Sequence, residues 1–150
     1  MGRYFEDFQV DEHFVTQGRT IGEGDIHQFA GLVGDYTPLH VDAHYASKTR
    51  FGSRTAHGPL GLGAAIGLFT QLNVLGESVV GLLNLNWDFK AAVKLGDTIH
   101  ARVVVIETRL TSKGDTGIVK FQFEVLNQRE ELTQRGVMTV MIACRDARVQ

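Results

Sequence analysis

The 150-residue chain has one cysteine, Cys144, two prolines, and no apolar run long enough to span a bilayer. A single cysteine cannot form an internal disulfide, which is typical of proteins in a reducing compartment. The first ten residues carry acids and aromatics instead of a basic segment leading into an apolar one, so no secretory signal is expected. These absences predict a cytoplasmic protein that does not associate with a membrane.

An excess of charge of one sign is missing as well. Lys and Arg number 15 against 17 Asp and Glu, which gives a net charge of -2 at pH 7. Without a basic field, nucleic acid is not an expected partner. The hydrophobic content of 43% and charged content of 21% are those of an ordinary globular domain. No repeat or linker is visible, so we predict one domain spanning residues 1–150.

The first half of the chain has helical patterning. Thr20 to Glu23 has the spacing of a capping box, apolar residues recur at helical intervals to Val33, and Gly34 is a plausible helix end. Asp42 is placed to cap a short helix. A longer helix is expected from Pro59, which fits a first helical turn, to about Leu75.

The expected helix after Pro59 is rich in glycine and apolar residues and has no charge up to Val74. We therefore predict a core helix that is enclosed on all sides. Each interior glycine costs roughly 0.5–1 kcal/mol relative to alanine. So many glycines, at 61, 63 and 67, predict that something packs very close to the helix backbone.

The second half has the period of β-strands. Apolar and polar residues alternate over 83–89 and 119–125, and apolar segments at 99–106 and 137–144 complete a set of four strands. Residues 14–20 are expected to add another strand. The links are hairpin-sized, so the sheet should be antiparallel. One enclosed helix with a long meandering sheet predicts the α+β class and the hot-dog architecture, a curved antiparallel sheet wrapped around a central Gly/Ala-rich helix.

Candidate catalytic residues lie in two short segments. Gly34-Asp35-Tyr36-Thr37-Pro38-Leu39-His40 places a carboxylate and an imidazole close together, and Thr37, which precedes a proline, is biased to an extended backbone that stiffens the link. His57-Gly58-Pro59 then places a backbone N–H at the start of the long helix. An acid/base pair beside a helix N-terminus suits a reaction that moves protons while negative charge builds on an oxygen.

These segments resemble the MaoC-like hot-dog dehydratases, a family that includes the (R)-specific enoyl-CoA hydratases. The resemblance rests on residues 34–42 with Ala56-His57-Gly58, and extends to Phe29-Ala30, Arg50-Phe51-Gly52 and Gly96-Asp97-Thr98. It implies that Asp35 and His40 form the catalytic dyad and that the Gly58 amide is the oxyanion donor. It also implies a CoA thioester substrate, with Thr37 and His57 near it. The chain departs from the family pattern where Thr37 replaces a frequent Asn, and where Ile66 or Gly67 replaces a helix serine.

The implied reaction hydrates a 2-enoyl-CoA to an (R)-3-hydroxyacyl-CoA, or reverses that step, without a cofactor. We expect Asp35 and His40 to hold one water between them, with the assignment of base and acid left open. Acid/base help is typically worth about 10²–10⁴-fold in rate.

A small basic group lies just ahead of the long helix. Lys48, Arg50 and Arg54 either belong to a solvated loop or contact the phosphates of coenzyme A, and Arg50 and Arg54 are our candidates for that contact. Lys90 and Lys94 are weaker candidates for the same role.

Other readings of these residues are less favoured. His40 and His44, with Asp42 between them and His57 near, raise a metal site, but no zinc-protease motif is present and we predict no metal. Gly61-Leu62-Gly63 falls short of a dinucleotide fingerprint.

Two functional alternatives stay open: an acyl-CoA thioesterase on the same fold, and a non-catalytic acyl-CoA-binding or dehydratase-partner subunit. A sheet curled around one helix leaves an edge, so a homodimer or higher homo-oligomer is expected, with the acyl groove at its boundary.

Overall fold

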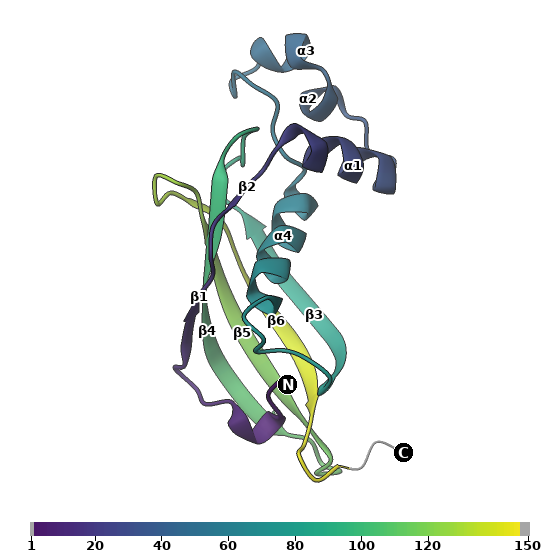
Figure 1. Ribbon diagram of the computed structural model, residues 1–150, viewed down its shortest axis with the longest axis vertical. Helices are drawn as coiled ribbons and strands as arrows, with labels where there is room; N and C mark the ends of the chain where they lie inside the picture. The colour runs from purple at the N-terminus through teal and green to yellow at the C-terminus, as the bar shows by residue number, and fades with distance from the viewer. Residues whose placement is uncertain (1, 148–150) are drawn as a thin grey trace.

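The computed structural model describes residues 2–147. Its main feature is a long curved sheet with one helix, α4, lying across the concave face, while the other helices gather beyond one end of α4 (Figure 1). The α-helices are α1 (Glu23–Val33), α2 (Pro38–Val41), α3 (Ala43–Ser47) and α4 (Gly58–Thr70), and a 3-10 turn, η1, spans Phe5–Asp7. This arrangement confirms the α+β class and the predicted sheet around a helix. No helix among residues 2–147 is long and apolar enough to cross a membrane.

The sheet is antiparallel throughout, with the order β1-β4-β5-β6-β3 and β2 paired to β4. Its strands are β1 (His13–Val15), β2 (Arg19–Thr20), β3 (Val79–Phe89), β4 (Thr98–Leu110), β5 (Thr116–Leu126) and β6 (Leu132–Ala143). The four predicted long strands are confirmed, although each is longer than its alternating segment. The strand predicted over residues 14–20 is instead two short strands that pair with different parts of β4.

The helix ends follow local hydrogen bonds. The capping box predicted at Thr20 is wrong, because Thr20 pairs with Thr98 in the sheet. Gly22 is the N-cap instead, and its N–H donates to the Asp25 carboxylate at 2.8 Å. The predicted end of α1 at Gly34 is confirmed by a left-handed φ of 75°. Asp42 caps α3 as predicted, since its side chain accepts a hydrogen bond from the Tyr45 amide at 2.9 Å.

Two predictions about α4 are wrong. The helix ends at Thr70 instead of Leu75, and Asn73, with a φ of 61°, turns the chain toward β3. It is also not enclosed on all sides, because Gly63 and Thr70 are exposed while Ala65 and Phe69 are buried. The sequence shows apolar residues all around α4, but within one chain the sheet covers only one face of this helix.

The glycines of α4 differ in their surroundings. A Cβ at Gly61 would lie 2.4 Å from the Gln134 side chain, so close packing explains this glycine, as predicted. Gly63 and Gly67 have nothing within 4 Å of such an atom, so the same explanation is wrong for them. The open face of α4 therefore carries two of the three interior glycines.

Aromatic contacts hold α4 on the sheet. The ring of Phe69 lies 5.1 Å from that of Phe121 and 5.4 Å from that of Phe123, and all three are fully buried. Such pairs add to the free energy of burial by about 0.5–1.5 kcal/mol each. The packing fixes the helix axis, and with it the position of the α4 N-terminus beside α1, α2 and α3 (Figure 1).

Candidate active site

Asp35 lies just after α1, where Gly34 turns the chain away from the helix. One carboxylate oxygen, Oδ1, accepts hydrogen bonds from the Thr37 hydroxyl at 2.6 Å and the Thr37 amide at 3.1 Å. These bonds lower the pKa of Asp35 below its usual value, and the bond from the Thr37 hydroxyl has the largest effect. The nearby imidazoles of His57 and His40 also lower this pKa. No group in residues 2–147 donates a hydrogen bond to the other oxygen, Oδ2. Asp35 is therefore an ordered carboxylate with one oxygen available.

His40 lies on α2, which the sequence did not reveal as a helix. Thr37 has an extended backbone, and Pro38 occupies the first helical position. Together they start this single turn. The Nδ1 atom of His40 lies 2.7 Å from the carbonyl oxygen of Thr55. Because a carbonyl only accepts, Nδ1 carries the proton, and Nε2 of a neutral ring is left as an acceptor.

His57 lies under His40. The two rings are stacked, with centroids 3.9 Å apart and planes inclined by 25°, and Phe29 lies 4.9 Å from the other side of His57. Nε2 of His57 donates to the main-chain carbonyl of Asp35 at 2.9 Å, which links the two segments of the motif. With 2% exposure, the ring offers almost no surface to a ligand, so its visible role is to support His40 and Asp35.

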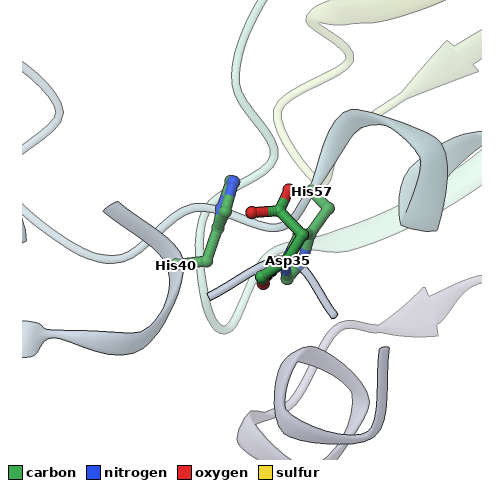
Figure 2. Close-up of side chains that lie close together, drawn as sticks. All are labelled: Asp35, His40 and His57. Atoms are coloured by element: carbon green, nitrogen blue, oxygen red, sulfur yellow. Dashed lines mark hydrogen bonds between the residues drawn. The ribbon is translucent and has the colours of Figure 1, made fainter. Parts of the chain in front are cut away.

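One carboxylate oxygen of Asp35, one ring nitrogen of His40 and one ring nitrogen of His57 lie within 4.8 Å of one another. Figure 2 shows the Asp35 carboxylate directed toward the His40 ring, with His57 beside them. The structure thus brings together the two residues predicted as the dyad. A shared water fits this spacing, since it would join Oδ2 of Asp35 to Nε2 of His40.

The same cluster is a poor metal site. An imidazole binds a metal through a lone pair in its ring plane. The His40 and His57 rings are stacked face to face, so their in-plane lone pairs do not converge on one point. His44, considered with them in the sequence, is exposed on α3. The geometry favours proton transfer over metal ligation.

Gly58 is the first residue of α4, and His57 is its N-cap. Amides in the first turn of a helix have no acceptor within it and lie at the positive end of the helix dipole. A Cβ at position 58 would lie 2.9 Å from the Phe89 ring, so a side chain here would displace Phe89. Gly58 directly follows His57, whose ring stacks on His40 and bonds to the main chain of Asp35.

Gly58 also lines a pocket of about 700 Å³. Four cationic side chains, Arg50, Lys90, Lys94 and Arg129, and one carboxylate, Glu131, line it too. Arg129 is paired with Glu131 at 3.2 Å, so the pocket keeps three cations without that partner and is called the basic pocket. Lys90 and Lys94, the weaker candidates for contact with coenzyme A phosphates, thus lie in the same pocket as Arg50. The sequence did not indicate Arg129, because it lies in a segment that was predicted only as a hairpin link. Asp35 and His40 do not line this pocket, whereas Gly58, the residue after His57, does.

Arg54 is placed differently. Its guanidinium is buried and pairs with Glu23 at 2.8 Å, with His27 at 3.5 Å, so it fixes the loop before α4 to α1. Arg54 does not line the 700 Å³ pocket. The predicted contact of Arg54 with substrate has no support from this geometry, whereas that of Arg50 does.

Comparisons with known proteins identify the family of this chain. The family described as "MaoC like domain" matches residues 7–125. An (R)-specific enoyl-CoA hydratase of Rhodospirillum rubrum is 42% identical over 105 residues, which cover 68% of this chain and 69% of that protein. A 3-hydroxybutyryl-CoA dehydratase of Methylorubrum extorquens is 35% identical over 106 residues, covering 69% of this chain and 64% of that protein.

Solved structures show the same fold. An Archaeoglobus protein described as a monoamine oxidase regulatory protein superposes with a TM-score of 0.88 at 35% identity, covering 95% of both chains. An unliganded R-hydratase of Pseudomonas aeruginosa gives 0.80 at 29% identity, covering 95% of this chain and 86% of that one. A Mycobacterium tuberculosis protein with a double hotdog fold gives 0.87 at 22% identity, covering 97% of this chain and 45% of that one.

The curved antiparallel sheet around α4 therefore defines a hot-dog protein, in which Asp35, His40 and His57 lie close together. Within that class, the chain belongs to the MaoC-like dehydratase domain family.

Replacing Thr37 should change the pH dependence of any reaction that uses the Asp35 carboxylate. The Thr37 hydroxyl stabilises the ionised form, so Thr37→Val raises the pKa of Asp35. The acid limb of the kcat/KM profile should then move to higher pH, because more protons are bound at a given pH. Thr37→Ser keeps the hydroxyl and should leave the limb in place. An unmoved limb in the valine variant would show that Asp35 is not the group that titrates.

Proposed function

We propose that this protein hydrates a 2-enoyl-CoA to a (R)-3-hydroxyacyl-CoA and catalyses the reverse dehydration. The observation that carries the proposal is the close approach of Asp35 to His40, together with His57, the N-cap of α4, stacked on His40. The relatives named as (R)-specific hydratase and as dehydratase support the same reaction and substrate class. The stereochemistry rests on the relatives alone.

In the proposed mechanism, one water donates its hydrogens to Oδ2 of Asp35 and Nε2 of His40. Its oxygen bonds to C3 of the enoyl group as one member of the pair removes a proton. A proton from the pair is delivered to C2, so that one water is added across the double bond. Meanwhile, the Gly58 N–H donates to the thioester oxygen, on which negative charge develops, and the helix dipole acts in the same direction.

The hydration reaction is directly measurable. Adding the protein to a short 2-enoyl-CoA should remove the enoyl absorbance without releasing free thiol. Thiol release would identify a thioesterase, and binding without either change would identify a non-catalytic subunit. The Thr37 contacts speak against the last reading, because this residue orders Asp35 although it differs from the family's usual Asn.

We further propose that the basic pocket holds the phosphates of coenzyme A. Arg50 is exposed, with its guanidinium 4.7 Å from the centre of the Phe51 ring, and Lys94, on the segment after β3, lines the same pocket. Gly58 lines the pocket, so the coenzyme A part of a thioester bound at the Gly58 amide would extend past these cations. Hydrogen bonds to charged groups contribute about 1.5–3 kcal/mol each.

Reversing a charge in this pocket should weaken binding of the nucleotide phosphates of coenzyme A and leave binding of the rest of the substrate unchanged. For Arg50→Glu or Lys94→Glu, we expect KM for an enoyl-CoA to rise by about tenfold or more, as the loss of one charge-assisted bond implies. KM for an enoyl-pantetheine, which lacks the nucleotide phosphates, should stay within about twofold. Lys113→Glu, in the exposed β4–β5 turn, is the matched control. Equal KM changes for both substrates would contradict the assignment.

A homodimer is the proposed assembly. β3 is an edge strand with exposed apolar residues, including Val80, Leu82 and Leu83, and α4 exposes its small-residue face nearby. Unpaired edges and exposed apolar surface favour association with a second copy. Sedimentation should give the mass of a dimer or of a higher oligomer, and a monomer at micromolar concentration would exclude this assembly.

A further inference from the structure

Gln134 is a buried polar residue that the proposed reaction does not use. It lies near the start of β6, a strand paired with β5 on one side and β3 on the other, and is 2% exposed. Its side chain crosses from the sheet to α4, where Nε2 lies 3.2 Å from the carbonyl oxygen of Gly58. A buried amide on a central strand therefore contacts the residue whose N–H is the proposed oxyanion donor.

The orientation of the Gln134 amide is fixed by a second contact. The indole Nε1 of Trp87 lies 2.9 Å from Oε1 of Gln134. An indole N–H only donates, so it must face the amide oxygen, and the NH₂ group must then face Gly58. The three residues form a chain of hydrogen bonds from Trp87 through Gln134 to Gly58.

Gly58 needs such an anchor. Glycine has no Cβ to restrict its backbone, so its own sterics do not fix the direction of its N–H. The Gly58 N–H lies in the same peptide plane as the His57 carbonyl, which accepts hydrogen bonds from the Leu60 and Gly61 amides at 3.0 and 3.3 Å. The Gly58 carbonyl lies in the next plane, which Gln134 holds, so both peptide planes that meet at Gly58 are anchored. Gly61 makes the contact possible, because a Cβ there would lie 2.4 Å from Nε2 of Gln134.

We propose that Gln134 is a positioning residue for the oxyanion donor: by holding the second of the two peptide planes that meet at Gly58, it keeps this residue, and with it the N–H, in place for the substrate thioester oxygen. The proposal rests on the proposed function, since it assigns that amide its role. Misplacing a catalytic group by about 1 Å can lower a rate by roughly 10²-fold. Loss of Gln134 should therefore act on kcat more than on KM.

The test compares Gln134→Met with the parent protein and with Gln122→Met, a matched change on β5 where no hydrogen bond to α4 is present. Hydration of a short 2-enoyl-CoA by Gln134→Met should show a kcat lower by roughly 10–100-fold, with KM within about threefold. In an Asp35→Asn background, in which turnover should be slower by about 10²–10⁴-fold, the infrared carbonyl stretch of the bound thioester should move toward its value in solution when Gln134→Met is added. A substitution that lowered only the stability of the protein, and left it folded, would not shift the carbonyl stretch of the bound thioester.

Gly61→Ala supplies a second route to the same result. Alanine favours helix by about 0.5–1 kcal/mol over glycine, so it should not unfold α4, but its methyl displaces the Gln134 amide. We expect the same fall in kcat and the same carbonyl shift. An unchanged kcat and an unchanged carbonyl stretch in both variants would overturn the role of Gln134.

The outcome stays separate from that of the proposed function. If the parent protein hydrates no enoyl-CoA, the proposed function fails, and the proposed role of Gln134 in catalysis fails with it. If the parent is active and loses activity with Asp35→Asn, but not with Gln134→Met, only the role of Gln134 fails. The NMR signal of the Gly58 amide, which needs no substrate, should shift in Gln134→Met and not in Gln122→Met.

Discussion

Asp35→Asn is expected to lower kcat for enoyl-CoA hydration by about 10²–10⁴-fold, the range for the loss of an acid/base group. The substitution keeps the Thr37 contacts to Oδ1 but removes the negative charge that receives a water proton. His40→Ala should have an effect of the same size, because it removes Nε2 from the other side of the water. The rate of loss of enoyl absorbance measures both.

The double variant should be about as slow as the slower single one, since residues that act as a unit are not additive. Two controls separate this result from a general loss of structure. His44→Ala removes an exposed imidazole on α3, and Asp88→Asn removes an exposed carboxylate on β3. Neither should change kcat by more than about twofold. Full activity in Asp35→Asn or His40→Ala would refute the dyad.

Removing the Gly58 N–H should lower kcat by about 10²–10³-fold, as for one oxyanion donor. Proline removes this N–H, and His57 already has the extended backbone that a following proline requires, with φ -55° and ψ 136°. The ring would meet Phe89, so the change is best made in a Phe89→Ala background.

The matched control in that background is Gly58→Ala, which adds a side chain but keeps the N–H. The two proteins, Phe89→Ala/Gly58→Pro and Phe89→Ala/Gly58→Ala, thus differ chiefly in one hydrogen-bond donor. Their ratio of kcat measures the donor, and thermal unfolding checks that both are folded. Equal kcat values would exclude the Gly58 amide from catalysis.

Much of the fold could be predicted because it depends on local patterns. Alternation over 83–89 and 119–125 indicates the two faces of a strand, and the hairpin-sized links between β4, β5 and β6 leave only antiparallel pairing for these strands. The pairing of β3 with β6 could not be predicted this way, because no short link joins them. The open face of α4 could not be predicted, because an apolar pattern does not tell which neighbours cover it in one chain. The short helix α2 was missed because one turn started by a proline has no periodicity to detect.

The site was predictable to the extent that its chemistry lies in one motif. Asp35, His40 and Gly58 come from two segments with a recognisable order, and the structure brings these segments together. Gln134 and Arg129 carry no such signal, since a glutamine near a strand start and an arginine in a turn are ordinary there. The ion pair of Arg54 with Glu23 was equally hidden, because it joins residues 31 positions apart.

The central claim is that Asp35 and His40 act through one water on one face of the substrate. Hydration of a short 2-enoyl-CoA in deuterated water tests it most directly, with the configuration at C2 and C3 of the product read by NMR. Addition of deuterium and hydroxyl to the same face is the predicted result, with the R configuration at C3. Addition to opposite faces would contradict a single water held by this pair.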